Sequence, residues 1–150
     1  MPLPIAVQLY SVRNELKEDF RGTLEKVKAM GYDGVEFAGL FDHAPEDVRQ
    51  MCAEIGLIPS SAHRSHRDIA ADPDATFATY AKIGTPYIAI AGVSEEYRPG
   101  HEKFEESLKS IRALGKKAKE YGLQLLNIGT ICSRFGIIVS SSSISTSIMW

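Results

Sequence analysis

The first 126 residues alternate between short apolar runs rich in β-forming residues and stretches with helical periodicity. Most of the runs are nearly continuous in apolar residues, which is typical of parallel strands buried on both faces. Strict alternation of strand and helix favours right-handed crossover connections. The sequence therefore predicts an α/β protein with five parallel strands and four helices between them. The predicted strands cover residues 5–10, 34–38, 57–63, 86–91 and 123–126.

Each helical stretch has one apolar face. The first is predicted over 14–30, because apolar residues recur there every three or four positions. The second begins near Pro45, the third begins at Asp72-Pro73, and the fourth covers 101–121. A glycine ends each stretch, at the position where a left-handed residue commonly terminates a helix. These glycines are Gly31, Gly56, Gly84 and Gly122.

The charge balance and the cysteines limit the possible function classes. The chain has 17 basic and 19 acidic side chains and a formal net charge of −2, which argues against a strongly basic nucleic-acid binder. Its apolar runs are too short to span a bilayer, and the N-terminus lacks the pattern of a signal peptide. Cys52 and Cys132 form no CxxC motif. We therefore expect a cytoplasmic protein whose partners are neither membranes nor nucleic acids.

The last 24 residues have a different composition. Residues 127–150 contain a single charged side chain, Arg134, whereas the first 126 residues contain the other 35. Seven serines and six isoleucines in this segment make it a β-prone sequence of low complexity. We therefore divide the chain into residues 1–126, which carry the repeated pattern, and a divergent tail over 127–150.

Isolated polar residues near the ends of the predicted strands are the candidates for a functional site. In parallel α/β folds, the site lies at the carboxyl ends of the strands. Gln8 and Tyr10 lie at the end of the first strand, Glu36 lies within the second, and His63 ends the third. Polar side chains in apolar strands are costly unless they are paired or used.

Glu36 lies between Val35 and Phe37 and must face the opposite side of the strand from both. One interpretation is a general base, or an acceptor for a substrate hydroxyl. The other is a structural carboxylate that pairs with a histidine or arginine of a neighbouring strand. The position alone favours the functional interpretation.

His63 and His66 have the spacing HxxH. Two imidazoles three residues apart can share a metal on a helix, but a strand or loop does not guarantee that geometry. A substrate contact at the strand end is the stronger interpretation. No phosphate-binding glycine motif follows a strand, and no GxSxG motif supplies a serine nucleophile.

Several segments together resemble a known family: residues 5–13 (IAVQLYSVR), residues 31–39 (GYDGVEFAG), the strand ending at His63, and residues 118–126 (AKEYGLQLL). In this register they are similar to the N-terminal half of sugar phosphate isomerase/epimerase proteins, which have the xylose isomerase-like TIM barrel. The resemblance implies a (β/α)8 fold of which this chain carries five strands and four helices. A barrel of this type has about 250 residues.

The resemblance also implies a chemistry. Members of this family use a divalent metal (Mn, Zn, Mg or Co) to assist proton transfer next to a sugar or keto-sugar carbonyl. By this likeness Glu36 and His63 are the expected catalytic residues, and Gln8, Tyr10 and His66 are the expected substrate contacts. The family's principal metal ligands lie on later strands, so we assign no metal ligand here and expect this chain alone to hold metal poorly.

The likeness stops at residue 126, which leads to three functional hypotheses. The first is a truncated or frame-disrupted isomerase or epimerase with little activity of its own. The second is a non-catalytic half-barrel that forms a homodimer or binds a partner through its open edges, with the tail as a possible additional strand. The third is an enzyme related to endonuclease IV, which the net charge of −2 disfavours.

Overall fold

The computed structural model describes residues 4–91, 94–129 and 137–140. They form one six-stranded sheet in the order β1-β2-β3-β4-β5-β6. The first five strands are parallel, and β6 is antiparallel to β5. The strands are β1 Ala6–Gln8, β2 Gly34–Phe37, β3 Ile58–Arg64, β4 Tyr87–Ile90, β5 Gln124–Gly129 and β6 Ile137–Ser140.

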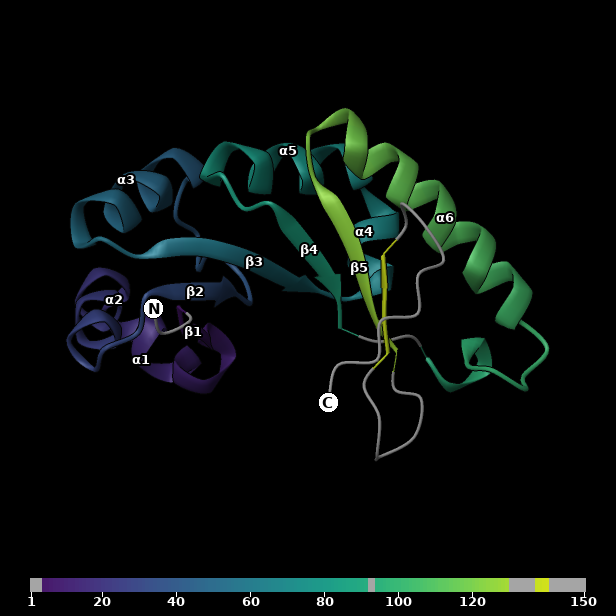
Figure 1. The fold of residues 1–150 in the computed structure, drawn as a ribbon, viewed down its shortest axis with the longest axis horizontal. Helices are drawn as coiled ribbons and strands as arrows, with labels where there is room; N and C mark the ends of the chain where they lie inside the picture. The colour runs from purple at the N-terminus through teal and green to yellow at the C-terminus, as the bar shows by residue number, and fades with distance from the viewer. Residues whose placement is uncertain (1–3, 92–93, 130–136, 141–150) are drawn as a thin grey trace.

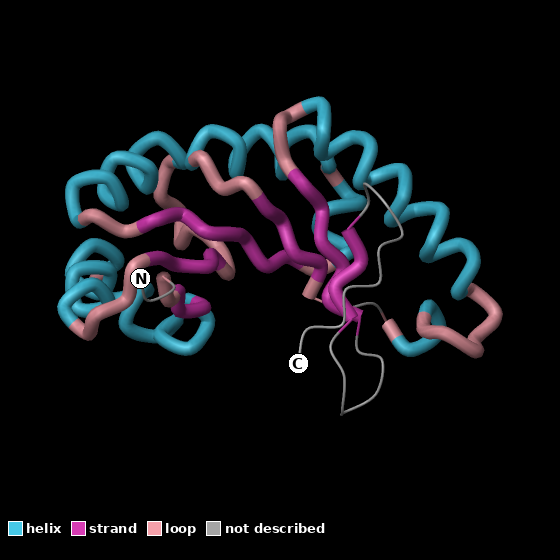
Figure 2. The backbone as a smooth tube through the Cα atoms, viewed as in Figure 1, coloured by secondary structure: helices cyan, strands magenta, loops and turns pink. Residues whose placement is uncertain are grey.

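The strands form a curved sheet. Helices α3, α5 and α6 cover its convex side, and the strands face the concave side (Figure 1; Figure 2). The α-helices are α1 Arg13–Glu18, α2 Phe20–Ala29, α3 Pro45–Ile55, α4 His66–Ala71, α5 Pro73–Ile83 and α6 Phe104–Glu120. Two short 3-10 helices are η1 Leu9–Val12 and η2 Glu95–Tyr97. The predicted α/β fold with five parallel strands is therefore confirmed. None of the helices in the described ranges is long and apolar enough to cross a membrane.

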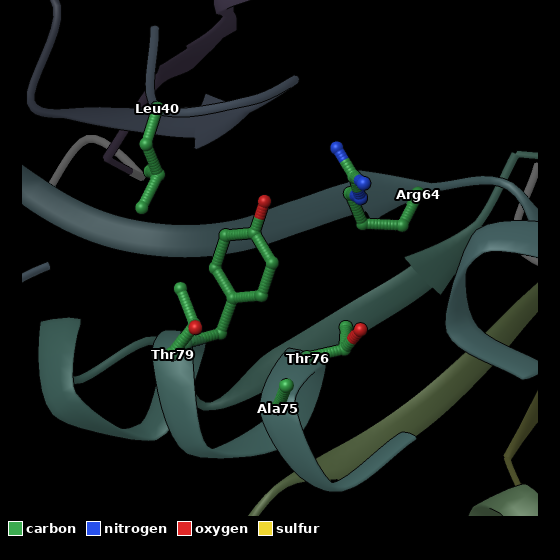
Figure 3. Close-up of a pocket in the computed structure, with 6 residues that line it drawn as sticks. Leu40, Arg64, Ala75, Thr76 and Thr79 are labelled. Atoms are coloured by element: carbon green, nitrogen blue, oxygen red, sulfur yellow. The ribbon is translucent and has the colours of Figure 1, made fainter. Parts of the chain in front are cut away.

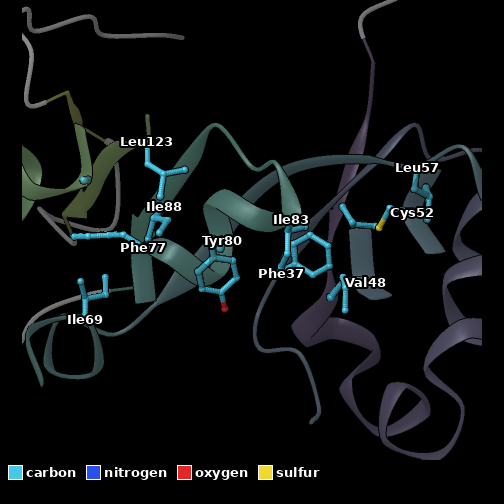
Figure 4. Packing of buried hydrophobic residues seen from close by; sticks show 14 of the residues in the cluster. Phe37, Val48, Cys52, Leu57, Ile69, Phe77, Tyr80, Ile83, Ile88 and Leu123 are labelled. Carbon is cyan, nitrogen blue, oxygen red and sulfur yellow. The ribbon is translucent and has the colours of Figure 1, made fainter. Parts of the chain in front are cut away.

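The core lies between the sheet and the helices (Figure 4). The apolar faces predicted for the first three helical stretches supply much of it: Leu16, Phe20, Leu24, Val27, Val48, Cys52, Phe77, Tyr80 and Ile83 are all buried. They pack against the outward-facing residues of the strands, among them Val35, Phe37, Ile88 and Ile90. In the fourth stretch Leu114, Gly115 and Ala118 are buried, whereas Phe104 and Leu108 stay partly exposed.

Local capping explains where the helices begin and end. Asp19 has extended backbone angles, and its carboxylate accepts a hydrogen bond from the Gly22 amide at 2.9 Å. The helix predicted over 14–30 is therefore two helices, because an aspartate that caps α2 interrupts it. Asp72 caps α5 in the same way, as predicted. Gly56 and Gly84 end α3 and α5 in the left-handed conformation, as expected.

The structure differs from the prediction at several further places. Strand β1 ends at Gln8, because the chain turns into η1 and buries Leu9 completely. The short helix α4 was not predicted; Ser65 caps it by accepting a hydrogen bond from the Asp68 amide. Helix α6 begins at Phe104 instead of residue 101.

Strand β5 continues to Gly129, three residues beyond the predicted end, because β6 pairs with its last four residues. Residues 137–140 of the tail therefore add a strand to the sheet beside β5. The other tail residues that were assigned to a divergent segment, 130–136 and 141–150, lie outside the described part of the chain.

Candidate active site

The carboxyl ends of β1, β2 and β3 bring four polar side chains together. Gln8 is the register partner of Glu36, and Glu36 is the partner of Ser61. His63 lies two residues beyond Ser61 and therefore faces the same side of the sheet. The sheet thus unites Gln8, Glu36 and His63, which the sequence predicted as site residues, and adds Ser61, which it did not.

Glu36 is held by neutral hydrogen-bond donors from both neighbouring strands. Its Oε1 accepts from Gln8 Nε2 at 2.9 Å, and its Oε2 accepts from Ser61 Oγ at 2.5 Å. Nδ1 of His63 lies 3.6 Å from Glu36 Oε1. The side chains of His63 and Glu36 are 23% and 22% exposed, so the carboxylate is largely shielded but still reachable.

The hydrogen bonds of Gln8 determine which nitrogen of His63 carries the proton. The Nε2 group of Gln8 has two hydrogens; one is donated to Glu36, and the other contacts His63 Nδ1. Nδ1 must then accept, and the neutral ring carries its proton on Nε2. Nε2 is buried and has no hydrogen-bond partner among the described residues. An unpaired buried donor costs about 1–3 kcal/mol, so a bound oxygen that reached this atom would stabilise it.

A cavity of about 320 Å³ opens at these strand ends. Gln8, Tyr10, His63, Arg64 and Asp68 are among the residues that line it. Its volume is close to the lower end of the range for small-molecule sites, about 300–1,000 Å³.

Tyr10 reaches this cavity from η1 and not from the end of β1. Tyr10 is 57% exposed, and the guanidinium of Arg13 lies 4.3 Å from its ring centre. Arg13 also donates a hydrogen bond to the backbone oxygen of Tyr10 at 2.9 Å. The two contacts hold an aromatic surface at the rim of the cavity.

The structure separates His66 from the other candidates. His66 begins α4, and its Nε2 forms a hydrogen bond with Ser110 Oγ of α6 at 2.8 Å. It lines a different cavity, of about 640 Å³, with Tyr97 and Glu96. Burial lowers the pKa of His66 below its ordinary value. Because His63 and His66 contact different elements, the HxxH spacing does not create a shared metal site.

Arg64 also lies in this region, at the end of the third strand, and the sequence assigned it no role. It ends β3 and lines the strand-end cavity, and its Nη2 lies 3.7 Å from Asp68 Oδ2. The signal for Ser61 was the two-residue period of the strand, which places it on the same face as His63. For Arg64 that period indicates the opposite face of the strand from His63.

These features define a parallel α/β half-barrel with a polar cluster at its strand ends. No protein-family model and no curated protein matches the sequence. Solved structures do match. A sugar phosphate isomerase/epimerase from Parabacteroides distasonis superposes with a TM-score of 0.64 at 20% identity, over 84% of this chain and 51% of that chain.

Two other matches have the same architecture. A xylose isomerase-like TIM barrel protein from Mycobacterium smegmatis in complex with magnesium has a TM-score of 0.55 at 18% identity, over 81% of this chain and 53% of that chain. An AP endonuclease of family 2 from Brucella melitensis has a TM-score of 0.58 at 16% identity, over 83% and 55%. The chain thus has the fold of about half a xylose isomerase-like TIM barrel, and the resemblance seen in the sequence is confirmed at the level of the fold.

Proposed function

We propose that this chain is a sugar phosphate isomerase/epimerase-like protein whose strand-end cluster moves a proton next to a sugar carbonyl. The observation that carries the proposal is the Glu36 carboxylate, which Gln8 and Ser61 hold beside the ring of His63. A carboxylate that hydrogen bonds fix next to a histidine is suited to general acid–base chemistry. The match to a sugar phosphate isomerase/epimerase structure supports the substrate class.

In the proposed reaction, Glu36 takes the proton from the carbon next to the carbonyl. The electron pair of the broken C–H bond forms an enediolate, and Nε2–H of His63 donates a hydrogen bond to its oxygen. Isomerisation needs the hydroxyl proton of the enediolate to pass to the former carbonyl oxygen before Glu36 returns its proton to the neighbouring carbon, so that the hydroxyl carbon becomes the new carbonyl. Epimerisation needs a second acid that protonates the same carbon from its other face. Gln8 positions Glu36 and His63, and Tyr10 contacts the sugar. His66 would contact only a substrate that extends into the 640 Å³ cavity.

The described residues do not provide a complete metal centre. A catalytic zinc has three protein ligands, and magnesium is usually held by one or two carboxylates together with waters and substrate oxygens. Glu36 and His63 could offer two ligands, but no group of three or more histidine, cysteine, aspartate or glutamate side chains gathers in the described part of the chain. We therefore expect this chain by itself to bind Mn, Zn, Mg or Co only weakly, and no step above depends on a metal.

The alternative function is a non-catalytic half-barrel that self-associates. Large apolar side chains at the amino ends of its strands are exposed: Ile58 at the start of β3 by 55% and Tyr87 at the start of β4 by 38%. Within the described sheet, β1 pairs only with β2 and forms an open edge. An open edge and exposed apolar residues are typical of interaction surfaces. A homodimer would cover them.

Deuterium exchange from D2O into a panel of aldose and ketose phosphates tests the catalytic proposal, because it detects proton abstraction even when turnover is slow. With Mn²⁺ present, we expect exchange next to the carbonyl that decreases at least about 100-fold in Glu36→Gln, the range for a lost general base. Glu25→Gln is the matched control, because Glu25 is an exposed carboxylate that pairs with Arg21 on α2. Equal exchange in Glu36→Gln and in the wild type would refute the role of Glu36.

If the wild-type chain exchanges no substrate proton, the catalytic proposal fails and sedimentation velocity tests the alternative. A dimer that dissociates in Tyr87→Lys supports self-association through the exposed apolar side chains at the starts of the strands. A monomer at all concentrations excludes it. Specific binding of abasic duplex DNA, relative to intact duplex, would favour an endonuclease function instead.

A further inference from the structure

A second cavity lies behind the carboxyl end of β3, on the helix side of the sheet. It has a volume of about 260 Å³ and lies between helix α5, the end of β3 and the segment that follows β2 (Figure 3). Figure 3 shows Thr76 and Thr79 on α5, with Leu40 and the guanidinium of Arg64 across the space from them. Its lining residues are Leu40, Arg64, Ala75, Thr76, Thr79 and Tyr80.

Arg64 supplies the positive charge of this cavity. A guanidinium has five N–H donors, and Arg64 uses few of them. Its Nε is buried and has no hydrogen-bond partner in the described part of the chain. Its Nη2 lies 3.7 Å from a carboxylate oxygen of Asp68, a long contact to a side chain that is 43% exposed. The Arg64 side chain is 33% exposed, so the guanidinium is partly shielded from water, and its Nε is left unpaired, a state that an anionic ligand would relieve.

The other polar groups of the cavity can donate hydrogen bonds as well. Thr76 and Thr79 are three residues apart on α5 and contribute two hydroxyls to the same helix face. Tyr80 contributes a phenol, and burial raises its pKa although the nearby charge of Arg64 and a side-chain hydrogen bond with Arg64 act in the opposite direction. The phenol therefore stays protonated at neutral pH and can donate. None of the six described residues that line the cavity has a carboxylate.

Apart from Asp68, whose carboxylate lies beside Arg64, two other acidic residues next to the cavity are engaged elsewhere. The Asp72 carboxylate accepts a hydrogen bond from the Ala75 amide at 2.9 Å and caps α5. Asp74 pairs with Lys117 at 2.9 Å and accepts a hydrogen bond from Tyr121 on the protein surface. These contacts leave Arg64 and the hydroxyls as the groups that face the cavity. The N-terminus of α5 is capped by Asp72, so we assign it no donor in the cavity.

We propose that this cavity is a binding site for a small oxyanion such as phosphate, with Arg64 as its charged anchor and Thr76, Thr79 and Tyr80 as hydroxyl donors. A volume of about 260 Å³ is below the usual range of about 300–1,000 Å³ for drug-sized ligands, so it suits a small anion with waters and not a nucleotide. Arginine and hydroxyl donors match the oxygens of phosphate. The site does not depend on the proposed isomerase reaction.

Binding in this cavity would also change the candidate active site. Arg64 lines both the 260 Å³ cavity and the 320 Å³ cavity at the strand ends. An oxyanion on the guanidinium would neutralise positive charge that otherwise faces the strand-end cavity, and would fix the side chain that separates the two. Phosphate is thereby expected to weaken the attraction of anionic substrates to the strand ends.

Titration with inorganic phosphate, followed by ³¹P and ¹H–¹⁵N NMR, tests the proposal on the full chain. We expect saturable binding with amide shifts concentrated at residues 75–80, similar binding of sulfate, and weaker binding of planar acetate. Arg64→Gln should weaken phosphate binding at least about tenfold, the scale of a charge-assisted hydrogen bond. Arg67→Gln is the matched control, because Arg67 is the next arginine in the chain and its side chain is 93% exposed. It should change the affinity by less than about twofold.

Thr76→Val keeps the shape of the side chain and removes one hydroxyl, so it provides a second variant if Arg64→Gln fails to fold. We expect it to weaken phosphate binding about threefold or more, the loss of one net hydrogen bond. Absence of saturable binding would overturn the proposal. So would equal losses in Arg64→Gln and Arg67→Gln, or amide shifts confined to the strand-end cavity around Tyr10 and His63.

Discussion

Gly34 opens strand β2 at a point where its neighbours leave no room for a side chain. A Cβ at this position would lie 2.7 Å from the carbonyl oxygen of Ile58, 3.4 Å from the Cβ of Ile58 and 3.5 Å from the Cβ of Ala6. The Ile58 amide donates a hydrogen bond to the Asp33 oxygen at 2.9 Å, and Ile58 is the register partner of Gly34. The backbone of Ile58 therefore cannot move away without loss of sheet pairing.

Gly34→Ala should therefore destabilise the protein. Inserting a methyl group into a packed site costs about 1–3 kcal/mol, and the reduced freedom of the unfolded chain returns about 0.4–1 kcal/mol. We expect the free energy of unfolding to fall by about 1–2 kcal/mol. For a chain of this size the melting temperature then falls by about 2–8 °C. Thermal and urea unfolding followed by far-UV circular dichroism measure both quantities.

Gly31 provides the control, because it needs glycine for a different reason. Its φ is +96°, and no atom lies within 4 Å of a Cβ built there. Asparagine tolerates the left-handed region, so Gly31→Asn should cost less than Gly31→Ala. At position 34 the order reverses, and Gly34→Asn should cost more than Gly34→Ala. A Gly34→Ala protein that melts within about 1 °C of the wild type would refute the steric argument.

Three further predictions concern the core and two titratable groups. Phe77 is completely buried, so Phe77→Ala should lower the free energy of unfolding by about 3–5 kcal/mol in urea; a loss below about 1 kcal/mol would contradict its place in the core. Burial lowers the pKa of His66 below its ordinary value of 6.5, so the unfolded chain takes up this proton first. Stability should therefore fall as the pH drops below about 6.5, and less steeply in His66→Asn; equal pH slopes would exclude this contribution. Burial raises the pKa of the Cys52 thiol to about 11, so at pH 8 iodoacetamide should label it only after unfolding, as peptide mass mapping can show. Rapid labelling of the folded chain would indicate that α3 opens.

The large features of the fold could be predicted because each depends on residues close together in the chain. Periodic apolar residues identified the apolar faces of the first three helical stretches, and the glycine after α3 was correctly identified as its terminator. Asp19 was not recognised as a cap. Aspartate is a preferred N-cap residue, and its carboxylate accepts a hydrogen bond from the backbone amide of Gly22 in the first turn. Helix α4 was missed because it has only six residues.

The candidate site was partly predictable for the same reason. Gln8, Glu36 and His63 were identified because each is a polar residue in an apolar strand, and parallel pairing brings such residues to one edge of the sheet. The assignment of His66 to the same site assumed that nearness in sequence means nearness in space. The turn at Ser65 directs His66 into α4 and toward Ser110 instead.

The sequence by itself determined that this chain forms parallel strands covered by helices, because hydrophobic periodicity and helix-ending glycines act over a few residues. The tertiary structure alone decided which nitrogen of His63 carries the proton and which residues share a cavity. Hydrogen bonds such as that from Gln8 to Glu36 join residues 28 positions apart. Only the register of the sheet sets such distances, and the register results from the packing of all the strands and helices together.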